Sequence, residues 1–423
     1  MENIVFRCTI VVYLVIYLLV FLGISRLNRS YLNAYTISMG YVFILQGMGL
    51  FLESFKRDFT QDYSFKVLLI FVASLIIGTL FQYFGYKAGF GFNNKLKYMN
   101  SHVSVKTSSR ALKVCMVFMI LAFLILGIRG VGIYEWLFNT RNAYISGRAG
   151  NGIFYVLFEI FLCTSLAMAC YLLLKKKKGK NKYILLVLIL LGVTYFTGSK
   201  GFMLASVLLL VYLFDMFKKR ISFKTIFCLG LIALLAINLL LLIQSNITIL
   251  DYMSGDFYNN YLNEIEAIST GEMQYHYGQI FIEDLFYGFM PRNIFPNKPY
   301  IYGTSRLPAF FFGEQTVIDG NTPSFSSYGA AYADFGLFGV AVSAFASGFF
   351  LGIIEGAVRS SFRRYGLTFF GLMTYQLLIL TTIPVSNIIL IAYLVLLYIL
   401  IKHKKRPFRY NTAPQIRRPC RAK

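Results

Sequence analysis

The sequence predicts an all-α polytopic membrane protein with about eleven transmembrane helices and one large extracytoplasmic loop. Apolar residues make up 57% of the 423 residues and charged residues only 14%, a composition typical of a chain that crosses a bilayer many times. Apolar runs of about 20 residues, long enough to span the hydrocarbon layer, recur along the chain. Lys and Arg gather in the short segments between those runs, as they do in loops that stay in the cytoplasm.

The individual spans follow from the apolar runs. Because a helix that crosses the bilayer needs about 20 apolar residues, we expect helices at residues 4–24, 31–51, 64–86, 111–129, 152–174, 183–197, 201–217, 222–243, 328–358, 366–382 and 385–401. Only segment 198–200 separates the sixth helix from the seventh, so both should be short and joined by a tight turn. The run 328–358 is longer than one crossing needs, and its first turns should stand above the bilayer.

The distribution of positive charge predicts the orientation. A net charge of +23 would indicate nucleic-acid binding in a soluble protein, but here the charge lies beside apolar runs and reports topology, so no nucleic-acid partner is expected. Alternating backwards from a cytoplasmic C-terminus puts most of the 41 Lys and Arg on the cytoplasmic side. The chain then divides into a first group of eight spans, a large periplasmic or extracytoplasmic loop, three last spans and a basic cytoplasmic tail: residues 1–243, 244–327, 328–401 and 402–423.

Cysteine and histidine usage argues against a disulfide-stapled or metal-binding outer domain. None of the six Cys lies within 244–327, and the chain has no CxxC or His-rich spacing, so we expect neither a metal nor another cofactor. Glu159 is the one clear charge inside a predicted span. An ionisable side chain there is either a functional group or the partner of a polar group on a neighbouring helix, and the sequence leaves both open.

Residues 244–327 form the only long polar interval of the chain, so we expect the main site there. The interval is rich in Tyr, whose rings stack on sugar faces, although Tyr is also a usual residue of the membrane interface. Its titratable side chains provide candidate general bases. The four candidates are His276, Glu283, Asp319 and, just beyond the interval, Asp334. A lone His in a loop is more often a surface residue than a catalyst, so the base stays unresolved among them.

Basic residues on the same predicted face indicate an anion site. Arg141 and Arg148 precede a helix that begins at the outer face, and Lys200 precedes another. Helix N-termini bind anions, and Arg adds paired donors that suit phosphate oxygens. Three more basic residues lie in the long loop: Arg292, Lys298 and Arg306. Contacts with lipid head groups are the alternative. The positive-inside bias should deplete these positions of basic residues, so a specific anion site is favoured.

Three parts of the sequence resemble the Wzy-type polymerases of polysaccharide repeat units. Segment 197–201, Thr-Gly-Ser-Lys-Gly, is similar to the Gly-Ser-Arg-Gly turn that opens a helix in that family. Segment 291–299, Pro-Arg-Asn-Ile-Phe-Pro-Asn-Lys-Pro, resembles a Pro-Arg…Lys-Pro stretch in the family's large periplasmic loop. Segments 321–324 and 331–339 resemble the start of the next helix. Lys200 stands where the family more often has Arg, which keeps the charge but loses a bidentate contact.

The resemblance implies a glycosyltransferase of the bacterial cytoplasmic (inner) membrane that joins undecaprenyl-pyrophosphate-linked oligosaccharide units into O-antigen or a related surface polysaccharide. A pyrophosphate leaving group needs stabilisation of negative charge rather than a proton. The expected pyrophosphate contacts are Arg141, Arg148, Lys200 and Arg292, with Lys298 and Arg306 in support. A candidate base would activate the acceptor hydroxyl. The expected partners are the lipid-linked oligosaccharide and membrane lipid, and the involvement of a chain-length regulator stays open.

Two alternatives remain beside polymerisation. An O-antigen ligase uses the same donor and a similar outer loop, but transfers finished chains to the lipid A core. A lipid-linked oligosaccharide flippase would carry charges along a central cavity and no long outer loop. The chain also has no convincing internal repeat of the kind that builds many transporters. The sequence therefore favours a polymerase first, a ligase second and a flippase third.

Overall fold

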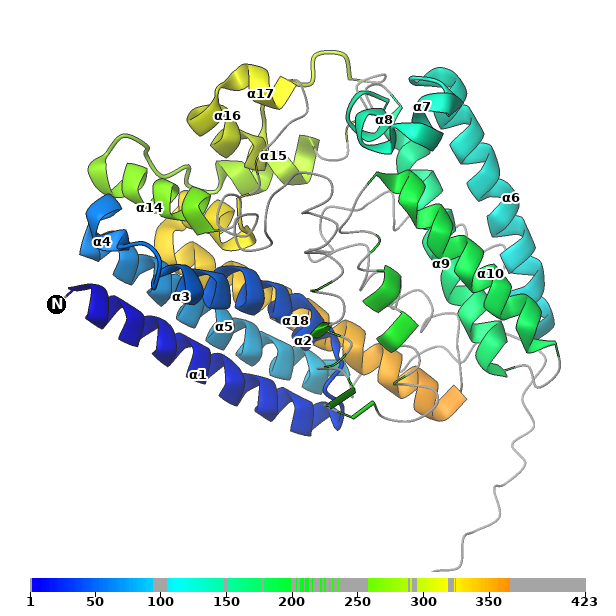
Figure 1. The fold of residues 1–423 in the computed structure, drawn as a ribbon, viewed down its shortest axis with the longest axis horizontal. Helices are drawn as coiled ribbons and strands as arrows, with labels where there is room; N and C mark the ends of the chain where they lie inside the picture. The colour runs from blue at the N-terminus through cyan, green and yellow to red at the C-terminus, as the bar shows by residue number, and fades with distance from the viewer. Residues whose placement is uncertain are drawn as a thin grey trace, which may run out of the picture.

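The computed structural model describes residues 2–93, 105–147, 151–175, 179–198, scattered positions between 203 and 235, and residues 258–287, 290, 295–318, 323 and 325–365. Every regular element in these parts of the chain is a helix, as predicted. The long helices run across the molecule, and the short helices gather at one end of it (Figure 1).

Seven helices in the described residues are long and apolar enough to cross a membrane: Glu2–Asn28, Ala34–Glu53, Phe65–Phe92, Ser109–Arg129, Gly152–Leu173, Lys180–Thr197 and Tyr328–Gly356. Each coincides with a predicted span, so a multi-pass membrane protein is confirmed. The predicted spans 366–382 and 385–401 lie outside the described residues, and 201–217 and 222–243 are described only at scattered positions. The count of about eleven therefore stays a prediction.

The first two spans pack as a hairpin at the edge of the molecule. Helix α1 (Glu2–Asn28) is continuous, whereas the second span consists of α2 (Ala34–Tyr41), a π-helix (Val42–Met48) and α3 (Gly49–Glu53). Asn33 starts the second span because its side chain accepts a hydrogen bond from the Thr36 N–H, and the Thr36 hydroxyl oxygen accepts one from the Asn33 N–H. Within the π-helix, Gly47 leaves room for the Tyr13 ring, which a Cβ at that position would overlap.

The longest helices, α5 (Phe65–Asn93) and α18 (Ser327–Tyr365), pack along each other through glycines on both surfaces (Figure 1). A Cβ at Gly85 or Gly89 would overlap the carbonyl oxygens of Phe345 and Phe349 on α18. In return, Cβ atoms at Gly348 and Gly352 would overlap the carbonyls of Gln82 and Tyr86 on α5. Each helix thus carries two glycines four residues apart, a spacing that lets membrane helices approach closely.

The close packing explains why α5 extends beyond the predicted boundary at residue 86. Hydropathy marks only the apolar part of a helix, but the α5 backbone stays helical through Asn93 because Gly89 and Phe92 still contact Phe349 of α18. The next helix, α6 (Val105–Arg129), likewise begins six residues before its predicted start at 111. The connection between the two is therefore shorter than the sequence predicts.

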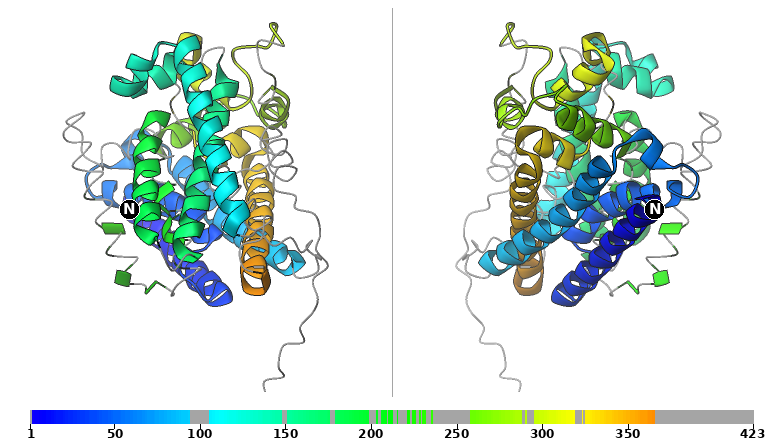
Figure 2. Two further views of the ribbon diagram at one scale, coloured as in Figure 1. Left: turned by 90° about the vertical axis from the view of Figure 1, so that its right-hand side faces the viewer. Right: turned by 90° about the vertical axis from the view of Figure 1, so that its left-hand side faces the viewer.

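A second group of helices stands beside the first. Helices α6 and α10 (Lys180–Val193) both pack against α9 (Gly152–Lys175), as two views of the molecule also show (Figures 1 and 2). Phe158, Leu162 and Leu166 of α9 are buried in the shared core of this group. The 3-10 turn Thr194–Thr197 follows α10 directly, so this span ends at residue 197 as predicted; residues 199 and 200 of the predicted tight turn lie outside the described residues.

Short helices occupy the segments that the sequence assigns to outer loops. They are α7 (Ile133–Phe138), α8 (Thr140–Ser146), α14 (Asn260–Thr270), α15 (Gln279–Tyr287), α16 (Arg306–Phe312), α17 (Glu314–Ile318) and the 3-10 turn Gly303–Ser305. All of them lie at one end of the molecule (Figures 1 and 2). Helix α14 is amphipathic, and its residues Tyr261, Leu262 and Ile265 are fully buried against α5 and α18. The polar interval therefore folds onto the membrane helices; its orientation stays a prediction.

Candidate functional site

The site begins at a break in α18. Phe335 and Gly336 leave the helical conformation, with φ/ψ of −144°/21° and 62°/−148°. Only glycine adopts the second conformation without strain. After the break the helix resumes close to the preceding turn, where a Cβ on Gly339 would overlap the Ala331 carbonyl. Segment 331–339, one of those that carry the family resemblance, is therefore a kink with glycine at the positive φ of residue 336 and at the close approach of residue 339.

The kink presents Asp334 to the start of α15. One carboxylate oxygen accepts hydrogen bonds from the N–H groups of Gly278 and Ile280, both at 3.1 Å, and the other accepts from Phe281 N–H at 3.0 Å. These are amides that the first turn of a helix leaves without partners, and a carboxylate also opposes the positive end of the helix dipole. Asp334, a predicted base, is thus 4% exposed and holds α15 on α18.

The backbone reinforces this junction. The N–H of His276 donates to the Ala333 carbonyl at 2.9 Å, and the N–H of Tyr277 donates to the Asp334 carbonyl at 3.0 Å. His276, also a predicted base, has a half-buried side chain close to Asp334, Glu283 and Arg306. Burial lowers the pKa of His276 below its ordinary value of 6.5, in spite of the two carboxylates. The imidazole is therefore uncharged at pH 7 and can accept a proton.

Glu283, a third predicted base, is paired with Arg306, a predicted pyrophosphate contact. The guanidinium donates from Nε at 2.7 Å and from an Nη at 2.6 Å, one bond to each carboxylate oxygen. Gly303 N–H adds a bond at 2.8 Å and Gln279 another at 2.9 Å. Arg306 is the main reason that the pKa of Glu283 falls to about 2. The stability that the ionised Glu283 contributes is present above its ordinary pKa of 4.5 and is lost as the pH falls toward 2.

A second carboxylate on α15 fixes the following turn. Asp284 accepts a hydrogen bond at 3.2 Å from Thr304 N–H and lies against Gly303, whose φ of 56° and lack of a Cβ make room for it. Burial raises the pKa of Asp284 above its ordinary value. Nearby, the Lys298 ammonium lies 4.5 Å from the centre of the Tyr302 ring, a cation–π contact. Five sequence-predicted residues therefore meet here: His276, Glu283, Lys298, Arg306 and Asp334.

A cleft of about 610 Å³ opens beside this junction, in the size range of ligand sites. It lies where the start of α5, the end of α14, the segment before α15 and the kink of α18 meet. Its lining combines aromatic, hydroxyl and charged side chains, among them Lys66, Ser269, Tyr275, Tyr277, Tyr332 and Asp334. Tyr275 packs edge-on against Tyr277 and Tyr332, with ring centres 6.4 Å and 6.1 Å apart. Stacking surfaces, hydroxyls and a cation suit a ligand with sugar and phosphate groups.

Lys66 is the cleft residue that sequence reasoning missed. It is exposed, at the second position of α5, and belongs to the end of the molecule that carries the short helices. A signal was available, because Lys66 begins an apolar run on the predicted outer face, where basic residues should be scarce. The same signal marks Arg141 and Arg148 in an outer loop, whereas Lys66 stands at the start of a predicted span.

A buried acid lies behind the cleft. Glu264 of α14 is fully buried, with its carboxyl against Gly329 of α18, where a Cβ would come within 2.7 Å of an oxygen. Burial raises the pKa of Glu264 well above its ordinary value, because a buried carboxylate loses its hydration. Because it packs α14 onto α18 and does not line the cleft, its position indicates a structural role.

The second predicted anion-binding region lies at the same end of the molecule. Gly198, which opens the segment similar to the family's Gly-Ser-Arg-Gly turn, has a φ of 64°. A Cβ there would lie 2.5 Å from Tyr144 Cβ and 2.7 Å from the Thr140 carbonyl oxygen, both on α8. The start of the turn thus packs on the helix that contains Arg141. Two segments that were predicted separately to bind an anion are adjacent.

Glu159 lies just below this turn. The Tyr155 hydroxyl forms hydrogen bonds with Glu159 Oε1 at 2.7 Å and with the Thr197 carbonyl at 2.9 Å. The partner Tyr155 belongs to the same helix as Glu159, and only its second bond reaches the neighbouring turn, so the two interpretations of this carboxylate both stay open. Arg148, Lys200, Arg292 and Asp319 lie outside the described residues, and Arg141 is described only as part of α8. Among the described residues, no cluster of His, Cys, Asp or Glu is arranged to hold a metal ion.

Comparison with known proteins agrees with the motifs. No protein-family model and no solved structure matches the chain. The chain is 24% identical over 324 residues to an O-antigen polymerase of Salmonella typhimurium and to one of Salmonella typhi, an alignment that spans 75% of this chain and 74% of each relative. The described helices fit a multi-pass membrane protein. Together, the two matched O-antigen polymerases support assignment of this chain to the Wzy-type polymerase family.

Proposed function

We propose that the protein joins undecaprenyl-pyrophosphate-linked oligosaccharide units into O-antigen or a related surface polysaccharide at the outer face of the cytoplasmic membrane. The observation that carries the proposal furthest is the cleft beside the α18 kink, which combines Tyr275, Tyr277 and Tyr332 with Lys66. The cleft lies at the start of α5 and at the kink of α18, the predicted outer ends of these membrane helices, where a lipid-linked sugar would present its head group. The two related O-antigen polymerases support the reaction class.

The reaction needs one bond made and one bond broken. A hydroxyl of the acceptor sugar attacks the anomeric carbon of the donor chain, and the bond from that carbon to the pyrophosphate oxygen breaks. Undecaprenyl pyrophosphate leaves with the electron pair, and the hydroxyl proton passes to a base. The leaving group requires nearby positive charge, for which Arg141, Arg148, Lys200 and Arg292 remain the proposed contacts, with Lys298 and, in the cleft, Lys66 in support.

The contacts of the candidate bases favour His276. Asp334 has its carboxylate oxygens occupied by three backbone N–H groups, and Glu283 is bound by Arg306. Both are therefore proposed as positioning residues, and Arg306 acts mainly through Glu283. His276 is neutral at pH 7 and stands in the chain between Tyr275 and Tyr277, both of which line the cleft, which makes it the proposed base. Asp319 keeps its place as the remaining candidate.

The orientation completes the proposal. The C-terminal tail lies in the cytoplasm, and residues 244–327 face the periplasm or the cell exterior, as the charge distribution predicts. The cleft and the turn at Gly198 then lie on the side of the membrane where no nucleotide sugars exist. The sugar donor must therefore arrive there already activated on a lipid.

The sugar-chain ladder of a strain that lacks the protein tests the function. We expect surface lipid that carries single repeat units, and return of long chains when the wild-type gene is restored. In the deletion strain, genes that carry Arg292→Ala or Arg141→Ala should leave only single units. The control Arg57→Ala should restore long chains, because it changes only an exposed ion pair with Asp62 on the same side.

The same ladder separates the alternatives. Complete absence of surface sugar with lipid-linked chains accumulating in the membrane would indicate an O-antigen ligase instead. Repeat units trapped on the cytoplasmic leaflet would indicate a flippase. A normal ladder in the deletion strain would contradict the proposed function altogether.

A further inference from the structure

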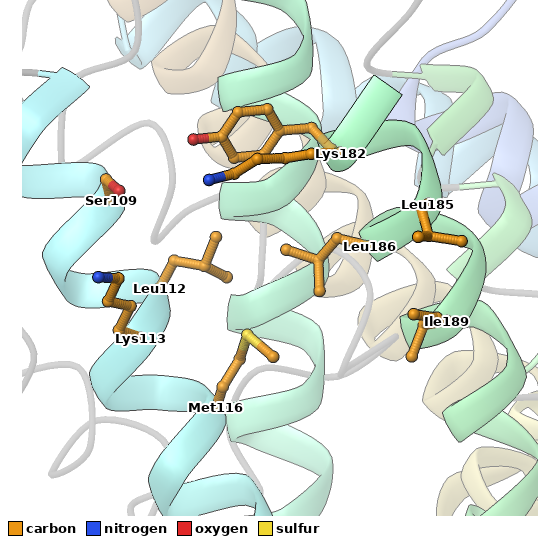
Figure 3. A pocket seen from close by; sticks show the side chains of 9 residues that line it. Ser109, Leu112, Lys113, Met116, Lys182, Leu185, Leu186 and Ile189 are labelled. Carbon is orange, nitrogen blue, oxygen red and sulfur yellow. The ribbon is translucent and has the colours of Figure 1, made fainter. Parts of the chain in front are cut away.

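A second cavity lies far from the proposed polymerisation site, at the opposite ends of the helices. It is a groove of about 280 Å³ between the first turns of α6 and α10. The residues that line it come from these two helices alone, and both helices pack against α9 (Figure 3). Neither helix start belongs to the end that carries the short helices, so the groove opens toward the predicted cytoplasmic leaflet.

The mouth of the groove is basic. Lys113 of α6 and Lys182 of α10 line it together with the Ser109 hydroxyl (Figure 3). Both lysines are exposed, and neither forms an ion pair with a carboxylate in the described part of the chain. None of the described lining residues is acidic. Two cations from different helices and a hydroxyl donor therefore face one opening without a compensating negative charge.

The rest of the groove is apolar and runs along the membrane helices. Leu112 and Met116 of α6 face Leu186 and Ile189 of α10 (Figure 3). From Lys182 to Ile189 the α10 axis rises by about 10 Å, so the apolar strip extends from the mouth into the hydrocarbon layer. A lysine pair at a helix end with an apolar strip beneath it matches a phospholipid, whose phosphate stays at the interface while its acyl chain descends.

We propose that this groove binds an anionic phospholipid of the cytoplasmic leaflet, with the phosphate between Lys113 and Lys182 and an acyl chain along Met116 and Ile189. Basic pockets between transmembrane helices on the cytoplasmic side bind anionic head groups. The Lys-rich sequence at 175–182 raises the local concentration of such lipids. The bound lipid fills the space between α6 and α10 and holds both helices on α9. The proposal does not depend on the reaction catalysed at the other end.

Native mass spectrometry of the full-length protein, released from nanodiscs of phosphatidylcholine with a minor fraction of phosphatidylglycerol, tests the proposal. We expect the wild-type protein to retain phosphatidylglycerol selectively. Lys113→Gln/Lys182→Gln should lower its apparent affinity roughly 30-fold, because each lysine near an anionic surface contributes a factor of about five. Lys113→Arg/Lys182→Arg should retain the lipid. Lys87→Gln/Lys224→Gln removes two other exposed lysines and should leave retention unchanged.

A variant that fills the apolar half provides an independent readout. Ile189→Trp, at an exposed position, should displace the lipid while leaving both lysines in place. Equal retention of phosphatidylglycerol by the wild-type protein and the groove variants would overturn the proposal. So would a wild-type protein that retains phosphatidylcholine as well as it retains phosphatidylglycerol. Photo-crosslinks from position 185 in native membranes should capture lipid; capture of a protein helix at that position would assign the groove to a protein partner instead. Size-exclusion profiles establish that each variant is folded before its lipid is counted.

Discussion

Gly89→Leu is expected to separate α5 from α18 and to abolish polymer formation. A Cβ at Gly89 already overlaps the Phe349 carbonyl oxygen, so a leucine cannot be accepted without moving one helix away from the other. Overpacking of a tight core typically costs about 1–3 kcal/mol, and the upper end applies here because the obstacle is backbone. Thermal unfolding of the purified protein in detergent should show a clearly lowered midpoint.

Gly91→Leu is the matched control for this change. Gly91 lies two residues further along the same helix, and a Cβ there meets nothing within 4 Å. Its leucine variant should unfold like the wild-type protein and restore long sugar chains. Equal midpoints for Gly89→Leu and Gly91→Leu would show that α5 and α18 do not approach each other as described.

The second large effect is expected for Asp334→Ala. Removing the carboxylate leaves the N–H groups of Gly278, Ile280 and Phe281 without their acceptor. Loss of a helix cap costs about 0.5–2 kcal/mol, and bonds to a charged group contribute about 1.5–3 kcal/mol, so we expect a loss of roughly 2–3 kcal/mol. Hydrogen exchange of the α15 amides should accelerate strongly, and polymer formation should stop because the cleft wall moves.

Asp334→Asn separates positioning from base catalysis. The amide keeps one acceptor oxygen for the α15 amides but cannot accept a proton, so a positioning role predicts partial protection of α15 and residual polymer. Loss of all polymer with α15 amide exchange unchanged would instead identify Asp334 as the base. Glu314→Gln, an exposed change on the short helix α17, serves as the control and should alter neither measurement.

The sequence predicted the membrane spans well because their signal is local. Each of the seven described membrane-competent helices coincides with a predicted apolar run, since a bilayer imposes the same length on every span. The ends of α5 and α6 were placed wrongly because hydropathy stops where polar residues begin. Continuation of α5 depends on its contact with α18 across more than 250 residues of sequence, which no local window contains.

The site was only partly predictable for the same reason. Segment 331–339 drew attention through a resemblance, but its physical role as a kink that caps α15 requires the contact of Asp334 with Ile280. The pairing of Glu283 with Arg306 joined a predicted base to a predicted anion contact, which residue type alone does not reveal. The cleft gathers Lys66, Tyr275 and Tyr332 from three distant parts of the chain, so its composition emerges only after folding.

Glycine spacing carries a further signal in the sequence. Gly85 and Gly89, and likewise Gly348 and Gly352, are spaced four apart within apolar runs, the spacing typical of closely packed membrane helices. This pattern predicts that the two helices meet through glycine surfaces, and the structure shows them packed against each other in that way. Pairing α5 with α18 in advance would have placed Lys66 near the start of α18.

Reconstitution of the purified full-length protein with lipid-linked repeat units tests the central claim most directly. In liposomes, the wild-type protein is predicted to produce chains of two and more units with release of undecaprenyl pyrophosphate. Lys66→Gln should reduce this rate at least about tenfold, because it removes the charge proposed to contact the pyrophosphate of a bound unit. Lys56→Gln, an exposed change on the same side outside the cleft, should leave the rate unchanged. Chains that never exceed one unit with the wild-type protein, or equal rates for Lys66→Gln and wild type, would contradict the account.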